Sequence, residues 1–263
     1  MRLASGFKRS SERVAMEFSK YEGTGNDFII VFDDEVTPEL AIKMCHRNFG
    51  VGSDGVIVLK PSEVADFSFV LFNADGSLGD VSGNGLRCVG KFLHDKGHST
   101  ATSIKVDAGG EIKVLDLIKQ GDVVSQVRVD MGIPVDRGHL EMNGHTWHQI
   151  DTGNPHVVTM VDDPQEVSVA EIGEAMEYDP VFPDRTNVHF IKVEGDRIKA
   201  RFWERGVGET LACGTGSVAS LIASGLDKAT VVSKGGDLLV EKNPSGRVYL
   251  TGPAKHVFDG RLA

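Results

Sequence analysis

The chain has 263 residues, with 40% hydrophobic and 25% charged side chains and a formal net charge of −10. This composition is typical of a globular protein, and its acidic excess argues against a nucleic-acid or anionic-membrane partner. No apolar run approaches the roughly 20 residues that span a bilayer, and three widely spaced cysteines predict free thiols in a reducing cytoplasm.

The N-terminal stretch MRLASGFKRSSERVA is basic but lacks the apolar segment of a secretory signal. We interpret residues 1–15 as a disordered extension. An alternative translation start and an amphipathic targeting peptide are the other interpretations.

Strand signals dominate the rest of the chain. Short β-rich segments bounded by turn residues predict strands over 28–32, 56–59 and 67–72, and further along over 125–131, 156–161, 187–193 and 197–203. Thr37 and Pro38 are typical of a helix cap and first turn. Ser168 and Glu171 form a capping box before a second predicted helix.

Two further helices are predicted after similar Gly-x-Gly turns. One turn lies in VSGNGLRC, residues 81–88, and the other in ACGTGSVAS, residues 212–220. Each is followed by apolar positions on one helical face, and we expect the helices to end at Gly97 and Gly225.

The residues around the two turns indicate a weak internal repeat. Asn73 lies nine positions before Ser82, and Glu204 lies nine before Cys213. Each half of the chain then consists of strands, a Gly-x-Gly turn and one apolar helix. The turn-rich stretch 132–144 is the predicted boundary between the halves.

Several other segments superficially resemble ligand-binding motifs, but their sequence context excludes that interpretation. The glycines at 50, 52 and 55 follow a predicted helix and precede a strand, the reverse of a dinucleotide-binding turn. NADGSLGD lacks the acidic first and last ligands of an EF-hand. The cysteines are isolated and the histidines scattered, so we predict no metal site.

The two helix starts carry the candidate chemistry. The first N–H groups of a helix have no acceptor within it, and such an end binds anions, including carboxylates. A cysteine there, such as Cys213, is expected to have its thiolate favoured by the same N–H groups. We therefore predict a site for a thiolate and a carboxylate.

Polar residues at the ends of predicted elements add hydrogen-bonding groups to this site. Glu204 and Arg205 follow a strand directly before the second turn. One asparagine at such a position is usually a turn former. Five of them, together with one Glu–Arg pair, indicate recognition of ammonium and carboxylate groups; they are Asn26, Asn73, Asn84, Asn154 and Asn187.

These segments together resemble the diaminopimelate epimerase family. The matching motifs occur in the family's order and the resemblance covers roughly residues 18–258; the motifs are YEGTGNDFIIV, RNFGVGSDG, FNADGSLGDVSGNGLRC, DTGNPHVV, TNVHF and WERGVGETLACGTGSVA. The resemblance implies an α/β (α+β) fold of two similar halves, each an antiparallel sheet wrapped around a central helix, with the active site in the cleft between them. The expected halves are 16–135 and 136–255, with 256–263 returning to the first.

The resemblance also implies the chemistry. Family members invert the α-carbon of an amino acid without pyridoxal phosphate or metal, using two cysteines on opposite sides of the substrate as base and acid. By motif, the α-carboxylate is held by the backbone of Gly83, Asn84, Gly214 and Thr215. The other substrate contacts are Asn26, Asn73, Asn154, Asn187, Glu204 and Arg205, and His156 and Glu204 tune the two cysteines. A homodimer, with a small amino acid as substrate and no cofactor, is the expectation for this family.

One residue departs from the family pattern. Ser82 stands where the family has a cysteine, and a serine hydroxyl is a far weaker acid than a thiol. Three interpretations stay open: a natural variant that epimerises with serine or a bound water, an engineered Cys→Ser form, and a binder or one-base enzyme. The retained substrate-contact residues favour epimerisation of LL-2,6-diaminopimelate to the meso form, in lysine and peptidoglycan biosynthesis. A related racemase or one-base lyase and a non-catalytic amino-acid-binding protein are the alternatives.

Overall fold

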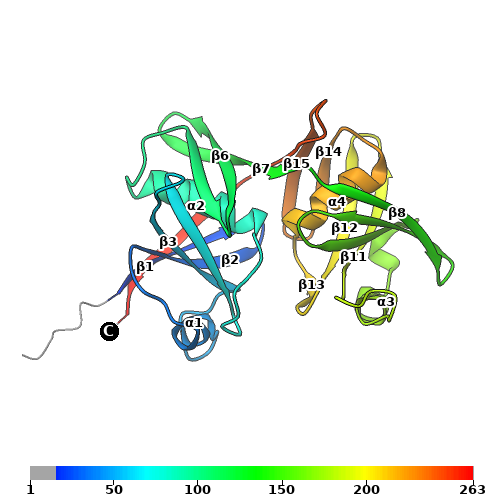
Figure 1. Ribbon diagram of the computed structural model, residues 1–263, viewed down its shortest axis with the longest axis horizontal. Helices are drawn as coiled ribbons and strands as arrows, with labels where there is room; N and C mark the ends of the chain where they lie inside the picture. Colours follow the sequence, from blue (N-terminus) through cyan, green and yellow to red (C-terminus); the bar gives the residue numbers. More distant parts are fainter. Residues whose placement is uncertain (1–15, 263) are drawn as a thin grey trace, which may run out of the picture.

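The computed structural model describes residues 16–262, and within them it is a mixed α/β protein with a large sheet and few helices, as the sequence predicted. Figure 1 shows two lobes, one containing α2 and the other α4. The first consists of β1 (Glu17–Gly23), β2 (Asn26–Phe32), α1 (Pro38–Cys45), β3 (Gly55–Pro61), β4 (Phe67–Asn73), α2 (Gly83–Asp95), β5 (Ser103–Ala108), β6 (Glu111–Gln120) and β7 (Val123–Gly132).

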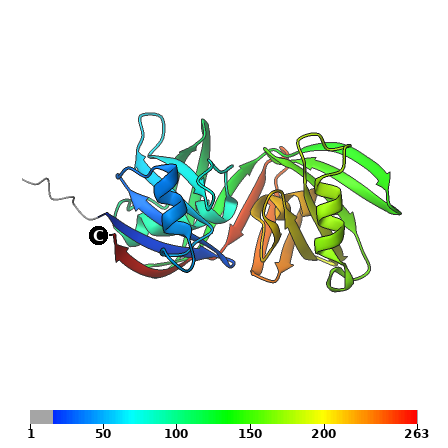
Figure 2. The ribbon, with the colours of Figure 1, turned by 90° about the horizontal axis from the view of Figure 1, so that it is seen from below.

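The second lobe follows along the chain. It consists of β8 (Val135–Met142), β9 (His145–Asp151), β10 (Pro155–Met160), the 3-10 helix η1 (Pro164–Glu166), α3 (Val169–Glu177), β11 (Asn187–Glu194), β12 (Arg197–Glu204), β13 (Gly208–Thr210), α4 (Gly214–Ser224), β14 (Lys228–Ser233), β15 (Gly236–Lys242) and β16 (Val248–Gly252). The last strand, β17 (Lys255–Arg261), pairs with β1 in the first lobe, and Figure 2 shows the two side by side.

The strand pairing differs from the expected antiparallel sheets. Four pairs are parallel: β2–β3, β4–β5, β10–β11 and β12–β14. A helix lies between the two strands of every such pair, α1, α2, α3 and α4 in that order. Parallel neighbours need a crossover connection, and a helix supplies it. The expectation of purely antiparallel sheets was therefore wrong, because each predicted helix is a crossover.

The predicted boundary stretch also contains regular structure. Residues 135–142, predicted as part of a turn-rich segment, form β8, which pairs antiparallel with β9. The lobes are joined through the sheet, since β7 pairs with β16, with Leu250 opposite Val129. The expected extension 1–15 lies outside the described residues.

Helices α2 and α4 are embedded in the main hydrophobic core. Leu86, Val89 and Leu93 of α2 are fully buried, and Val218 and Leu221 of α4 belong to the same cluster. The predicted helix ends are confirmed, because Gly97 and Gly225 both have positive φ. Of the described helices, none is long and apolar enough to cross a membrane.

The predicted caps of the other two helices have different outcomes. Thr37 caps α1 by accepting from the Leu40 N–H at 3.3 Å, as predicted. Ser168 occupies the N-cap of α3, but its side chain makes no capping hydrogen bond, so the capping box was wrong.

Candidate active site

The N-termini of α2 and α4 lie directly against each other. A Cβ atom added to Gly214 would lie 3.2 Å from the Gly83 Cα and 3.5 Å from the Asn84 nitrogen. Only glycine permits this approach without displacing a neighbour. Because the first N–H groups of both helices have no acceptor within them, the contact brings two anion-binding ends to one place.

Cys213 is the N-cap residue of α4 and is only 2% exposed. Its sulfur accepts a hydrogen bond from the Gly216 N–H at 3.3 Å, and it lies 3.1 Å from Glu204 Oε2 and 3.5 Å from Thr215 Oγ1. The thiol therefore has a carboxylate within hydrogen-bond distance and a helix N-terminus behind it.

The acidity of this pair differs from the expectation. Burial, followed by the charge of Glu204, raises the pKa of the Cys213 thiol well above its ordinary value. Burial also raises the pKa of the Glu204 carboxyl. The N–H groups do favour the thiolate, but desolvation outweighs them because both groups are removed from water. The thiol is protonated in this state and donates to Glu204.

Ser82 occupies the equivalent position on α2. It is the N-cap residue, half-buried, and its Oγ accepts from the Gly85 N–H at 3.1 Å. Within residues 16–262, this is the only hydrogen bond that its hydroxyl makes. The two helix starts are thus geometrically similar but chemically unequal, because Cys213 has a carboxylate partner and Ser82 has none.

His156 lies in a buried chain of hydrogen bonds. Its Nε2 is 2.8 Å from Asn154 Oδ1, and its Nδ1 is 2.7 Å from His189 Nε2. The amide oxygen only accepts, so Nε2 of His156 carries the proton, and Nδ1 accepts from His189. Burial lowers the pKa of both imidazoles, of His189 to about 3, and the pair is neutral. His189 in turn packs against Gly216 of α4.

This chain fixes the orientation of Asn154. Its Oδ1 accepts from both His156 and the Thr152 hydroxyl, the latter at 2.9 Å. The amide NH₂ of Asn154 therefore points away from these partners.

Asn84 joins the two lobes. Its Nδ2 donates to the Ala212 carbonyl at 3.2 Å and to Asn26 Oδ1 at 3.3 Å. Asn26 donates in turn to Asp54 Oδ2 at 2.6 Å. Two of the five predicted asparagines are thus in direct contact, beside the residue that precedes Cys213.

Arg205 directly follows the β12 strand and is hydrogen-bonded to Asn187, another predicted site residue. The Asn187 Oδ1 accepts from the Arg205 N–H at 3.0 Å, and Asn187 Nδ2 donates to the Pro155 carbonyl at 2.8 Å. The guanidinium donates to the Asp184 carbonyl and makes a 3.3 Å ion pair with Asp80 of the first lobe. Asp80 is an exposed residue that sequence reasoning missed.

Among the predicted asparagines, Asn73 is the one that no hydrogen bond of the described chain connects to the rest of the site. Its side chain bonds only within its own loop, to Ser77 Oγ at 3.0 Å, among the contacts of the described chain. Sequence reasoning also missed the role of His189, because a histidine inside a strand pattern carries no signal of its partner. The buried Arg87 of α2 was missed too, although LRC directly follows the first turn.

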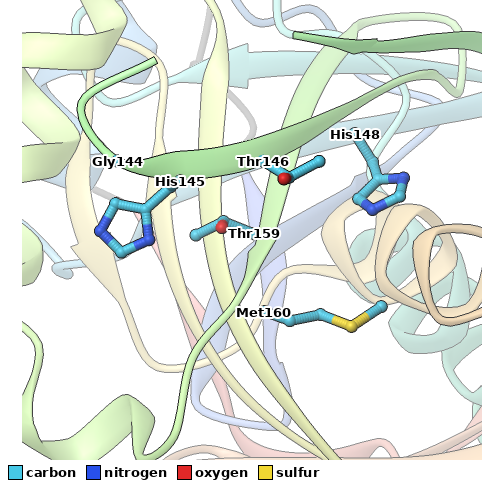
Figure 3. Close-up of a pocket in the computed structure, with 6 residues that line it drawn as sticks. All are labelled: Gly144, His145, Thr146, His148, Thr159 and Met160. Atoms are coloured by element: carbon cyan, nitrogen blue, oxygen red, sulfur yellow. The ribbon is translucent and has the colours of Figure 1, made fainter. Parts of the chain in front are cut away.

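Two surface hollows lie away from these residues. One, of about 370 Å³, is formed on β9 and β10, and Figure 3 shows His145 and His148 on its lining strand. The other, of about 420 Å³, is bounded by residues that include Asp130, Thr152 and Arg247. Neither contains Ser82, Cys213 or a helix N-terminus. We assign the site by the chemistry at the two helix starts, because neither hollow brings a nucleophile to an anion-binding group.

Comparison with known proteins identifies the family of this chain. The sequence profile of the diaminopimelate epimerase family matches residues 18–136 and 149–257. The chain belongs to the diaminopimelate epimerase family. Among the family's curated members, that of Desulfitobacterium hafniense is 40% identical over 277 aligned positions, covering 94% of this chain and 98% of its own. That of Methanococcus maripaludis is 38% identical over 277 positions, covering 94% and 99%.

Solved structures with the same fold are more distant in sequence. A hydroxyproline epimerase from Agrobacterium vitis superposes with a TM-score of 0.72 at 14% identity, covering 96% of this chain and 93% of its own. A PhzF-family phenazine biosynthesis protein from Bacillus anthracis gives 0.71 at 17% identity, covering 95% and 99%. At this identity the likeness establishes the fold.

Proposed function

We propose that this chain is a cofactor-independent isomerase that epimerises LL-2,6-diaminopimelate to the meso form, in lysine and peptidoglycan biosynthesis. The observation that carries the proposal is the contact between two Gly-x-Gly helix starts, one with a thiol hydrogen-bonded to the half-buried carboxylate of Glu204. Family membership agrees with it. The active site lies between two similar halves, with the division near residue 135 and β17 completing the first half.

The α-carboxylate binds between the two helix N-termini. Backbone N–H groups of Gly83 and Asn84 on one side, and of Gly214 and Thr215 on the other, donate to its oxygens. Loss of the α-proton places negative charge on the α-carbon and into this carboxylate. Fixed N–H donors in a dry site stabilise that charge without reorganising.

Cys213 removes the α-proton on one face. Its thiol already donates to Glu204 at 3.1 Å, so the carboxylate is in place to take the thiol proton. The raised pKa of Glu204 makes it a stronger base than an exposed carboxylate. The arriving α-ammonium adds a positive charge that favours the thiolate.

Ser82 lies on the other side of the substrate. When Cys213 acts as the base, the Ser82 hydroxyl or a bound water gives a proton to the opposite face of the α-carbon. General acid–base transfer is most efficient when the pKa of the donor is near the working pH. A serine hydroxyl and a water are both much weaker acids than a thiol, so each is a poorer proton donor to the carbanion. We infer that the second proton transfer is slower than the first.

The distal end of the substrate is held by Arg205, Asn154 and Asn187, with Asn73 contributing at the edge. Asn26, which contacts Asn84, lies at the α-carboxylate end. A planar guanidinium binds a carboxylate in bidentate fashion. Arg205 makes an ion pair with Asp80, and the distal carboxylate takes the place of Asp80 when the substrate binds. The protein is expected to act in the cytoplasm as a homodimer.

The test is NMR of separate LL- and meso-diaminopimelate samples with the purified chain in D2O. Loss of the α-proton signal reports abstraction, and interconversion of the isomers reports inversion. We expect both. A related racemase or one-base lyase would show exchange on other amino acids or yield an elimination product, and a binding protein would show stereoselective binding with no exchange.

A further inference from the structure

Arg87, on the second turn of α2, is a buried charge without a counter-ion. Its side chain is 0% exposed, and within residues 16–262 no carboxylate oxygen lies within 4.0 Å of its guanidinium. An unpaired buried charge is among the costliest groups a protein can hold. Burial lowers the pKa of Arg87 to about 10, so the group stays charged at neutral pH.

Every acceptor around the guanidinium is neutral. Nε donates to the Pro253 carbonyl at 3.2 Å, and Nη2 to Thr24 Oγ1 at 3.0 Å. Nη1 donates to Asn84 Oδ1 at 2.9 Å and to the Gly83 carbonyl at 3.3 Å. The hydrogen bonds are satisfied, but among the described residues no carboxylate contacts the guanidinium; Glu22 favours its charge only through space, and burial outweighs that effect.

Two glycines, Gly23 and Gly252, pack closely against the Arg87 side chain. A Cβ atom on Gly23 would lie 3.2 Å from Nη2, and one on Gly252 would lie 3.1 Å from Nε. The guanidinium therefore lies between the end of β1, the end of β16 and the first turn of α2. These segments meet where the two lobes join.

Arg87 also controls the asparagine that links the helices. By accepting from Arg87, Asn84 Oδ1 is fixed in place, which turns Asn84 Nδ2 toward the Ala212 carbonyl, next to Cys213. The two residues that contact Arg87 Nη1, Gly83 and Asn84, are the same residues whose N–H groups begin α2.

We propose that Arg87 is a positioning residue that supplies a buried positive charge, with no contacting carboxylate, behind the paired helix starts, and that this charge acts on the α-carboxylate of the substrate. The inference rests on the proposed function and deepens it. Two arginines then divide the substrate: Arg87 acts on the α-carboxylate through Gly83 and Asn84, and Arg205 contacts the distal carboxylate directly. The charge of Arg87 acts most strongly when the carbanion forms, because the carboxylate then gains negative charge.

The test separates charge from shape. In Arg87→Ala, α-deuterium exchange into diaminopimelate is expected to fall at least 100-fold, and millimolar guanidinium is expected to restore it at least tenfold. Urea has the same planar shape and similar N–H donors without the charge, and it is expected to restore little. Arg197→Ala, which removes an exposed 3.1 Å ion pair with Asp237, is the matched control and should leave exchange unchanged.

The outcomes distinguish the two proposals. An unmodified chain that exchanges no α-proton refutes the proposed function and this role with it. Undiminished exchange in Arg87→Ala, or equal rescue by urea, overturns the role of Arg87 alone. If Arg87→Ala does not fold, Arg87→Lys and Arg87→Gln decide: kcat/KM is expected to be at least tenfold higher for lysine, and equal values at equal Tm overturn the proposal.

Discussion

Replacing Ser82 by cysteine should convert an unequal pair of proton-transfer groups into a matched pair. Ser82 and Cys213 hold the same position at their helix starts, and each accepts from the N–H three residues on, at 3.1 and 3.3 Å. A thiol therefore fits at residue 82 by the geometry already present at residue 213. It differs from serine in acidity, which is the property the second proton transfer requires.

The size of the gain follows from the contribution of one positioned acid or base, roughly 10²–10⁴-fold in rate. We expect Ser82→Cys to raise the inversion rate by that order. Sulfur is a weaker acceptor than a hydroxyl, so the cap weakens and the free energy of unfolding falls by up to about 1 kcal/mol. The variant should thus be more active and slightly less stable.

The assay is isomer-resolved α-proton exchange and inversion in D2O, for the unmodified chain, Ser82→Cys and Ser82→Ala. The unmodified chain should exchange one isomer much faster than the other, with inversion slower than exchange. Ser82→Ala separates the two proton sources, since inversion falls further if the hydroxyl is the acid and is unchanged if a water is. Equal and rapid inversion of both isomers by the unmodified chain, with no gain from Ser82→Cys, would refute the reasoning.

Three other predictions concern the groups around this pair. Glu204→Gln removes the acceptor of the Cys213 thiol proton, and exchange should fall roughly 10²–10⁴-fold; exchange at the original rate would exclude Glu204 as that base. Arg205→Met should raise KM for diaminopimelate at least tenfold and remove its preference over lysine, which steady-state kinetics with both amino acids would measure. The buried His189 has its pKa lowered to about 3, so the unfolded chain binds a proton there below pH 6.5 that the folded protein does not. Its contribution to stability is therefore present above pH 6.5 and lost as pH falls, by about 2 kcal/mol at pH 5. Urea unfolding at pH 5 and above pH 6.5 should show a smaller loss of unfolding free energy at the lower pH in His189→Gln than in the unmodified chain. Identical pH dependence in the two proteins would contradict this.

The helix starts and ends could be predicted because their signals are local. Gly-x-Gly after a capping residue places the start of α2 and α4, and Gly97 and Gly225 end them through their positive φ. The asparagines at strand starts were likewise visible in the sequence, since Asn26 and Asn187 are the first residues of β2 and β11.

The remaining features depend on residues far apart in the chain. Parallel pairing is decided by where each crossover helix returns the chain, which no local pattern records. The sequence predicted a lowered pKa for Cys213, whereas the structure raises it. The helix start was visible in the sequence, but the burial of the thiol and the approach of Glu204 were not. Arg87 and His189 were overlooked for the same reason, as their partners Thr24 and His156 are 63 and 33 positions away.

The central claim is that Cys213 exchanges the α-proton of diaminopimelate. Its most direct measurement is α-deuterium incorporation into each isomer by Cys213→Ala, beside the unmodified chain, in D2O. The variant should keep its fold. It should incorporate no deuterium into either isomer, because the thiol at the paired helix starts has been removed. Exchange at the rate of the unmodified chain would contradict the account.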